Sequence, residues 1–190
     1  MATLFVDKID PQSGTALEIG SSGDTITIPS GATIVNSGTA TGFGGANTPY
    51  FQVKKTSDQT ISNASTTKVT SYAVVTESST GVFDVINNKF TATVAGRYLF
   101  TTKTGFYDGD NNLKRTTVYI YKNGSQYRTN DFFMANGGIR NSTVYDTWVE
   151  NVSVNDYFEV YVLQNTTDSG TCTVEGGSNQ ETTFSGFKLV

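Results

Sequence analysis

The chain has 190 residues, of which 36 % are hydrophobic and 12 % aromatic, and its formal net charge at pH 7 is −4. Glycine, serine, threonine and asparagine are abundant while good helix formers are sparse, which predicts an all-β protein with many loops. The acidic balance argues against nucleic acid as a partner, since nucleic-acid binders need a basic surface. No apolar run could span a membrane and residues 1–8 carry no visible signal peptide, so we expect synthesis in a cytoplasm without membrane insertion.

The sequence lacks the residues of the commonest catalytic and metal sites. It has no histidine, and Cys172 is the only cysteine, which excludes Ser-His-Asp and Cys-His constellations, zinc sites and an internal disulfide. Cys172 is expected to be a small buried residue. Carboxylate pairs for glycoside hydrolysis remain, with Glu150 and Glu159 or Glu175 and Glu181 as candidates, but acids this scattered are more simply surface charges. We therefore expect a protein that is not an enzyme and has no cofactor.

Residues 1–48 differ from the rest of the chain. Short apolar pairs, such as Ile26 and Ile28, are separated by glycine- and serine-rich turns, and aromatic residues are rare. Strands this short cannot bury enough apolar area within one chain to offset its conformational entropy. Three chains wound together could share an axial core, so we expect an intertwined trimeric β stem, with a disordered tail as the alternative. A glycine-rich linker follows at residues 39–48.

Residues 49–190 contain longer runs in which apolar and polar side chains alternate. The central stretch, residues 89–101, has two such runs joined by Ala95-Gly96, as in two half-buried strands. No stretch shows helical periodicity. The segment predicts one jelly-roll β-sandwich head on the N-terminal stem. The expected strands are 50–54, 58–62, 67–76, 82–86, 89–94, 96–107, 115–122, 125–134, 143–152, 156–165 and 181–189.

Counting strands predicts which loops share an end of the head. If the long central strand runs away from the stem, the loops 108–114, 135–142 and 166–180 all fall at the far apex. Tight turns at Asn123 and Asn155 fall at the stem end. Long loops at one end of a rigid scaffold form a typical binding face. The candidate binding residues in these loops are Asp108, Asp110, Asn111, Asn112, Asn136, Arg140, Asn141, Asp168, Glu175 and Asn179.

The first of these loops has the spacing of a calcium site. Asp108, Asp110 and Asn112 place oxygen ligands at alternate positions, which makes them candidate calcium ligands. The rest of an EF-hand is missing, because Leu113 stands at the position of the required glycine and Tyr119 at that of the bidentate glutamate. A polar turn between strands is the simpler interpretation.

Aromatic and apolar residues on both faces of one strand predict an oligomer. Tyr119 and Tyr121 share one face and Val118 and Ile120 the other, as expected where one face packs the sandwich and the other a second subunit. The single tryptophan, Trp148, is expected in the core or an interface, with an exposed shelf for a sugar ring as the alternative. The candidates for core or trimer interface are Tyr98, Phe100, Tyr119, Tyr121, Trp148, Phe184 and Phe187.

A series of short motifs resembles a known family. They are Gly81-Val-Phe-Asp84, Phe90-Thr91, Val94-Ala-Gly-Arg-Tyr-Leu-Phe100, Val118-Tyr-Ile-Tyr-Lys-Asn-Gly124, Val154-Asn-Asp-Tyr-Phe158 and Phe184-Ser-Gly-Phe-Lys-Leu189. In order and spacing, residues 49–190 resemble the complement subcomponent-q globular head of the tumour necrosis factor-like jelly-roll superfamily. Ala95 replaces the family's proline. The resemblance implies a compact homotrimer with aromatic residues along the threefold axis, and leaves the ligand open.

The N-terminal segment carries a second resemblance. From Leu17 to Phe43 it is similar to the repetitive Ser-Gly-Asp-Thr-Ile-Thr-Ile-Pro-Ser-Gly-Ala-Thr pattern of tail-fibre and other virion structural proteins of marine bacteriophages. Together the resemblances imply a homotrimeric virion protein, either a short fibre or a capsid-decorating appendage. Its stem would join other virion proteins and its head would bind a host-surface glycan or an outer-membrane component. The alternatives are a secreted or surface-displayed recognition module and, thirdly, a polysaccharide depolymerase.

Overall fold

The structure is a computed structural model that describes residues 9, 11, 13–35, 37, 47–177, 179 and 181–189. The chain divides into two units, residues 1–43 and 44–190. We call the first the stem segment and the second the head. The sequence predicts this boundary after residue 48, and the roles of the two units remain predictions.

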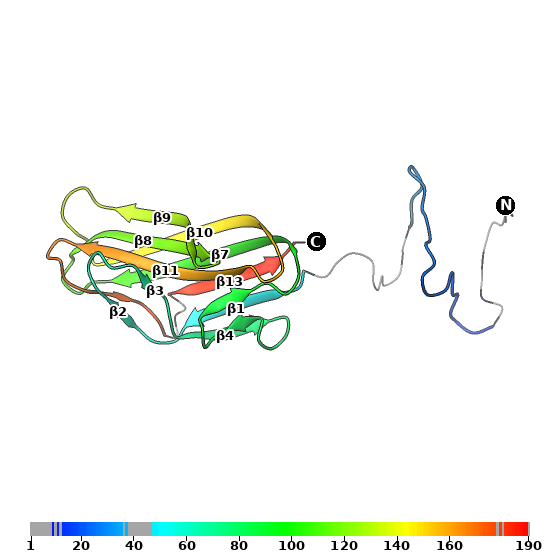
Figure 1. The fold of residues 1–190 in the computed structure, drawn as a ribbon, viewed down its shortest axis with the longest axis horizontal. Coiled ribbons are helices and arrows are strands. Elements are labelled where there is room, and N and C mark those ends of the chain that lie inside the picture. The colour runs from blue at the N-terminus through cyan, green and yellow to red at the C-terminus, as the bar shows by residue number, and fades with distance from the viewer. Residues whose placement is uncertain are drawn as a thin grey trace. The chain divides into compact units, whose positions relative to one another are not determined.

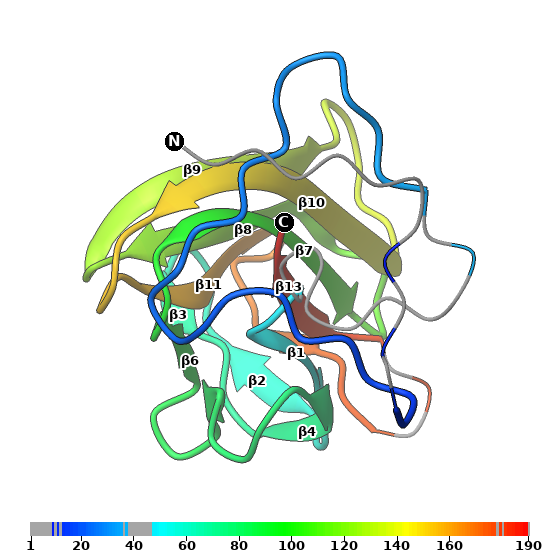
Figure 2. The same ribbon diagram turned by 90° about the vertical axis from the view of Figure 1, so that its right-hand side faces the viewer.

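Two antiparallel sheets form the head (Figure 1, Figure 2). Among the described residues the first sheet has seven strands and the second has six. The first sheet runs β4 (Tyr72–Glu77), β1 (Tyr50–Lys55), β13 (Thr183–Lys188), β7 (Gly96–Tyr107), β10 (Asn141–Val152), with β12 (Cys172–Val174) pairing both β7 and β2 (Gln59–Ile61). The second runs β5 (Phe83–Asp84), β6 (Lys89–Thr91), β11 (Tyr157–Thr166), β8 (Leu113–Lys122), β9 (Ser125–Phe133), with β3 (Thr67–Lys68) beside β11.

The expected all-β, jelly-roll-like sandwich is confirmed, and the part of the chain that the structure describes contains no helix. Beyond shorter or longer strand ends, two strands differ from the expectation. The strand predicted at 67–76 is interrupted by residues 69–71, where Ser71 takes a positive φ of 63°. The sequence did not predict β12, because three residues within a polar loop are too few to show alternation.

The core between the sheets is aromatic. Alternate residues of β7 point inward, so that Tyr98 and Phe100 are both 0 % exposed while Leu99 lies on the outer side. Trp148 is 5 % exposed and stacks on Phe100 with ring centroids 5.1 Å apart, so the exposed-shelf alternative for Trp148 is wrong. Phe184 belongs to the same cluster.

The other three interface-or-core candidates lie outside this cluster. Tyr119 and Tyr121 are on the outer face of the second sheet, where Tyr121 stacks on Tyr161 at 4.1 Å between centroids. Phe187 is 36 % exposed on the outer face of the first sheet.

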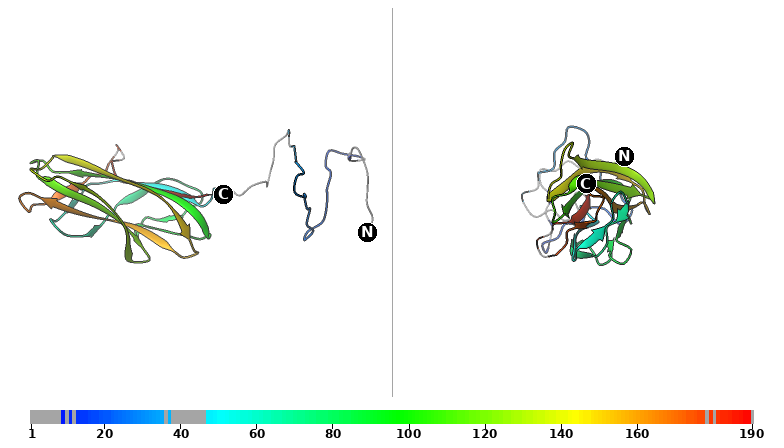
Figure 3. Two further views of the ribbon diagram at one scale, coloured as in Figure 1. Left: turned by 90° about the horizontal axis from the view of Figure 1, so that it is seen from above. Right: turned by 90° about the vertical axis from the view of Figure 1, so that its left-hand side faces the viewer.

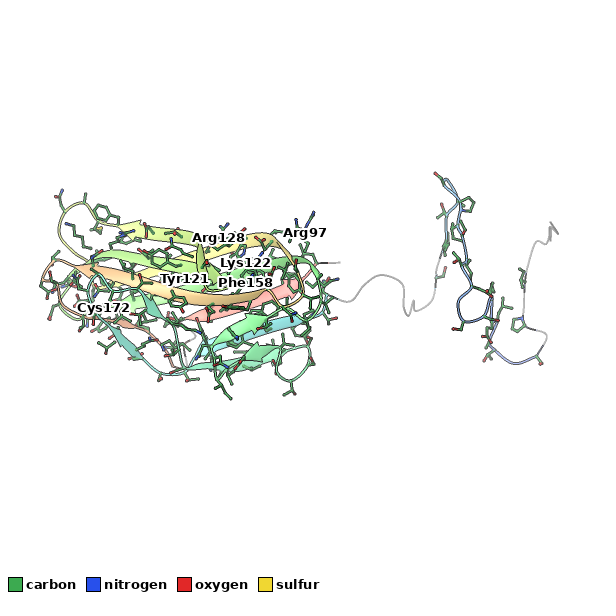
Figure 4. The ribbon with its side chains drawn as sticks, viewed as in Figure 1. Arg97, Tyr121, Lys122, Arg128, Phe158 and Cys172 are labelled. Carbon is green, nitrogen blue, oxygen red and sulfur yellow. The ribbon has the colours of Figure 1, made fainter. Side chains whose placement is uncertain are left out.

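An ion pair closes the side of the sandwich between β9 and β10. The guanidinium of Arg128 donates from Nε and Nη2 to the two carboxylate oxygens of Asp146, at 3.0 and 3.1 Å. The same guanidinium lies 5.4 Å from the ring centroid of Trp148. Figure 4 labels Arg128 among the side chains of the head. A charged pair therefore covers the aromatic core at this opening, because the guanidinium plane can stack on an indole while its edge binds a carboxylate.

Among the described residues of the stem segment no strand forms and no side chain is buried. The expected intertwined stem requires further copies of the chain and stays a prediction.

The core depends on one residue having no side chain. A Cβ at Gly186 would lie 2.5 Å from Cδ1 of Phe100 and 2.9 Å from Cε1 of Phe51. We expect Gly186→Ala to lower the free energy of unfolding by about 1–3 kcal/mol, because the aromatic rings must shift. Urea unfolding measures this. Gly109→Ala is the control, since its nearest atom is the Tyr107 hydroxyl at 3.7 Å, and equal stability of the two variants would contradict the packing argument.

Candidate functional site

Three loops meet at one end of the head, as the strand count predicts. The backbone N–H of Asp108 donates to the carbonyl of Arg140 at 2.8 Å, and that of Thr167 donates to Asn112 at 2.9 Å. We call this end, formed by residues 108–112, 134–140 and 167–171, the apex. In Figure 1 the orange loop after β11 marks it, at the opposite end of the head from the C-terminus.

The chain enters and leaves the head at the other end, which we call the base. The N–H of Lys188 donates to the carbonyl of Pro49 at 3.1 Å, which places the first and last strands side by side. The tight turns at Asn123 and Asn155 lie here as well, with positive φ values of 54° and 71°. Asn123 Nδ2 donates to Asp156 Oδ1 at 2.8 Å. The long strands run between base and apex (Figure 3).

The loop at 108–112 is a tight polar turn. Asp108 is 8 % exposed, and its Oδ1 accepts the N–H of Asp110 at 2.9 Å, which is an Asx turn. Asn111 has a positive φ of 63°, a conformation that asparagine tolerates. Asn112 turns away to the neighbouring loop, and the described residues contain no group of three or more acidic or thiol side chains placed for a metal. Calcium binding at Asp108, Asp110 and Asn112 remains a prediction.

Two apex loops touch backbone to backbone at Gly138. A Cβ there would lie 2.4 Å from the carbonyl oxygen of Asn111 and 2.8 Å from Cα of Asn112, so only glycine fits. Beside it, Leu113 and Ile139 exchange two backbone hydrogen bonds of 3.1 and 2.9 Å. The second loop is thereby fixed against the first.

Side chains tie the third loop to the first. Asn112 Nδ2 donates to Asp168 Oδ2 at 3.1 Å, and the Thr167 hydroxyl donates to Asn112 Oδ1 at 2.9 Å. The N–H of Gly170 donates to Asp168 Oδ1 at 2.9 Å, and this bond is the main reason that the pKa of Asp168 is lowered from its ordinary value. Asp168 is therefore a carboxylate at neutral pH.

Arg140 contributes the cation of the apex. Its guanidinium lies 5.2 Å from the ring centroid of Tyr107, and Nη2 donates to the Tyr107 hydroxyl at 2.7 Å. The arginine is exposed, so the tyrosine orients the positive charge without shielding it. Asp110, Asn136 and Asn141 are also exposed around it. The surface is a polar one of amides, hydroxyls and mixed charge.

Two predicted apex residues lie elsewhere. Residues 172–174 form β12, and the chain then runs back along the first sheet, so the N–H of Glu175 donates to the carbonyl of Gly105 at 2.9 Å. The structure does not bring Glu175 to the other candidates. Asn179 is exposed between Gly177 and Thr182, both of which form backbone hydrogen bonds with Lys55 of β1.

The carboxylate pairs are separated or neutralised. Burial raises the pKa of Glu175, helped by the nearby carboxylates of Glu181 and Asp58, but Glu181 is itself 3.2 Å from Nζ of Lys103. Glu150 and Glu159 lie in different sheets, since β10 pairs with β7 and not with β11.

Each of these last two acids pairs with a lysine. Glu150 pairs with Lys122 at 3.1 Å, and Glu159 pairs with Lys68. Each acid therefore belongs to a separate structural ion pair, and the two do not form a catalytic pair.

Sequence reasoning missed a fourth apex segment, residues 62–65. Asn63 Oδ1 accepts the N–H of Thr166 at 2.9 Å, and the N–H of Ala64 donates to Gln164 at 2.8 Å. The run of serine, threonine and asparagine between two short strands is the only signal, and it fits any loop. Nearby, Cys172 is 3 % exposed, and burial raises its pKa to about 12, so this thiol is unreactive as expected of a packing residue.

A second surface of interest lies across the first sheet. On its outer face Val149, Leu99, Phe187 and Tyr50 stand in one row, because each is the register partner of the next across β10, β7, β13 and β1. Val149 is 53 % exposed, Tyr50 38 % and Phe187 36 %, and Tyr145 adds a ring further along β10. A row of apolar side chains across four strands is what an interaction face presents.

No protein-family model matches the sequence, and no curated protein matches it. Solved structures do. Murine APRIL at pH 5.0 superposes with a TM-score of 0.55 at 14 % identity, over 74 % of this chain and 98 % of that one. Eiger TNF from S. frugiperda superposes with a TM-score of 0.54 at 8 % identity, over 75 % and 94 %. The head has a tumour necrosis factor-like jelly-roll fold.

The globular domain of zebrafish complement 1qA protein superposes more loosely, with a TM-score of 0.49 at 16 % identity over 75 % of this chain and 98 % of that one. The fold assignment rests on the two closer superpositions. At these identities the likeness concerns the fold alone. The described residues include no helix of the length and apolarity that a membrane crossing needs.

The glycine contact at the apex can be tested without disturbing the core. In Gly138→Ala the added methyl group must push residues 111–112 away, so the amides of Leu113 and Ile139 should exchange with deuterium at least ~10-fold faster. Asn136→Ala, an exposed change in the same loop, should leave both amides unchanged. Mass spectrometry of the native protein measures the rates, and equal rates in the two variants would contradict the close contact.

Proposed function

We propose that this chain is a non-enzymatic recognition protein that presents the apex of its head to a ligand. The observation that supports this most strongly is the division between the two ends of the head. Four loop segments, at 62–65, 108–112, 134–140 and 167–171, gather at the apex, whereas the base has the entry of the chain and only tight turns. A rigid sandwich with its long loops at the free end is suited to binding at that end.

The apex chemistry favours a polar ligand. Arg140 offers a fixed guanidinium, Asp168 a carboxylate, and Asn136 and Asn141 offer amides that both donate and accept hydrogen bonds. Such a set suits a host-surface glycan or a polar protein loop of an outer-membrane component. Each site would bind weakly, so affinity would come from several heads acting together.

Self-association as a homotrimer supplies these several heads. The resemblance of residues 49–190 to the complement subcomponent-q head implies three copies, and the apolar row from Val149 to Tyr50 supports a contact between copies. Leaving such a row in water forgoes roughly 25 cal/mol for each Å² of apolar surface. Covering it with another head recovers this free energy.

The virion assignment rests on the stem segment. Its repeated glycine- and serine-rich pattern is similar to that of bacteriophage tail-fibre and other virion proteins, so we propose a short fibre or a capsid-decorating appendage joined through the stem to other virion proteins. A secreted or surface-displayed recognition module is the second candidate, because the fold alone fits it equally well.

The location of the protein separates these two candidates. Antibodies against the head, viewed by electron microscopy, should label phage particles. Label on the tail supports a fibre and label on the capsid supports decoration. Particles that carry no label, with the antigen on the cell surface instead, would overturn the virion assignment in favour of the recognition module.

Binding at the apex predicts which substitutions matter. Replacing Asp110, Asn136 and Asn141 together by alanine should reduce binding to isolated host envelope by at least ~10-fold, since each such contact contributes on the order of 0.5–1.5 kcal/mol. Asn151→Ala, an exposed change at the base, should bind as the unaltered protein does. Equal binding by both variants would rule the apex out. New reducing ends in the same incubations would indicate a depolymerase.

The homotrimer predicts a mass about three times the 20.4 kDa of the chain in light scattering. Val149→Asp should lower that mass, because a carboxylate would have to be buried between copies. Val85→Asp is the matched control, since Val85 is 42 % exposed and Val149 53 %, so neither change disturbs the head itself. A monomeric mass for the unaltered protein would contradict the proposal.

A further inference from the structure

The stem segment repeats one small structural unit. The N–H of Asp24 donates to the carbonyl of Ser21 at 3.0 Å, and eight residues later the N–H of Ala32 donates to Pro29 at 3.1 Å. In each turn the third residue is a glycine with positive φ, 96° at Gly23 and 86° at Gly31. Both are therefore β-turns whose third position requires glycine, as in type II turns.

Apolar residues stand before, between and after these turns. Ile26 and Ile28 stand between the turns, Leu17 and Ile19 stand before the first one, and Ile34 follows the second. In an extended segment, residues two apart share a face, so each pair points one way and the residue inside it points the other way. Glu18 and Thr27 are those inside residues.

Nothing among the described residues covers the apolar face. The five side chains Leu17, Ile19, Ile26, Ile28 and Ile34 are 47–61 % exposed. Apolar side chains left exposed in such a series mark a surface that a partner would cover.

The spacing indicates what covers this face. Leu17 and Ile26 are nine residues apart but Ile26 and Ile34 are eight, because Gly20, with φ of 85°, is inserted ahead of the first turn. If successive turns of one chain stacked on each other, their apolar residues would therefore not align. In a second copy aligned residue by residue with the first, the spacing is identical, so each apolar side chain meets the same side chain of the other copy. The occupant that fits the spacing is another copy of this segment.

We propose that residues 17–34 pack against the same residues of the other copies, parallel and in register, with the five apolar side chains inside and Glu18 and Thr27 outside. The inference rests on the proposed homotrimer and adds its register. The carboxylate of Asp24 has a hydrogen-bond partner within its own turn, since its Oδ2 accepts the N–H of Ser21 at 2.7 Å.

A pair of adjacent substitutions in the full-length protein tests the register. Ile26 is 61 % exposed and Thr27 is also exposed in one chain, so a single chain gives no reason for different effects. We expect Ile26→Asp to speed deuterium exchange of amides 26–28 by at least ~10-fold, while Thr27→Asp leaves it unchanged. The amide of Phe100 in β7 should stay protected in both variants, which shows that the head is folded.

Light scattering on the same samples separates this inference from the proposed function. A trimeric mass, together with amides 26–28 that are protected and lose protection only in Ile26→Asp, supports both the stem packing and the homotrimer. A trimeric mass with unprotected amides, or with equal effects of the two variants, overturns the stem packing and leaves the trimer standing. A monomeric mass overturns both.

Discussion

The packing around Phe100 is the constraint on which the rest of the head depends. Its ring contacts those of Phe90, Tyr98, Trp148, Phe158 and Phe184, with centroids 4.7–6.2 Å apart. These residues come from β6, β7, β10, β11 and β13, so one side chain connects both sheets. Because neighbouring residues of a strand face opposite ways, fixing Phe100 inward also fixes Leu99 outward, and the apolar row on the outer face follows from the core.

The same register determines where each loop emerges. β7 and β10 pair along their full length, so Tyr107 and Asn141 leave the sheet together and their loops meet. β8 and β11 do likewise at Leu113 and Thr166. The candidate binding surface is therefore a consequence of strand pairing, and its side chains can vary without cost to the aromatic core.

Sequence patterns predicted those parts of the head that depend on alternation and strand parity. The choice of Tyr98 and Phe100 as candidates for core or trimer interface and the meeting of three loops both follow from counting residues and strands. Contacts between one residue and a partner far away in the sequence leave no periodic pattern, so they could not be predicted in this way. Glu175 was misplaced because β12, only three residues long, returns the chain along the sheet.

Lys55 illustrates the same limit. It is 0 % exposed and donates from Nζ to the carbonyl of Thr70 and to Gln59 Oε1, and burial lowers its pKa to about 8. From the sequence, a lysine at the end of a strand is expected to be exposed to solvent, and only the fold shows that Lys55 is buried.

The entry of the chain at the base has a mechanical consequence. β1 lies between β13 and β4 and begins next to Pro49, at the end of the head opposite the apex. When the apex is held and the preceding chain is pulled, the force acts along β1. All its ladder bonds to both neighbours are then loaded in shear at once, whereas a strand peeled from an edge breaks them one after another. A head loaded in this way stays folded under a pull that would unfold one whose first strand is peeled from an edge.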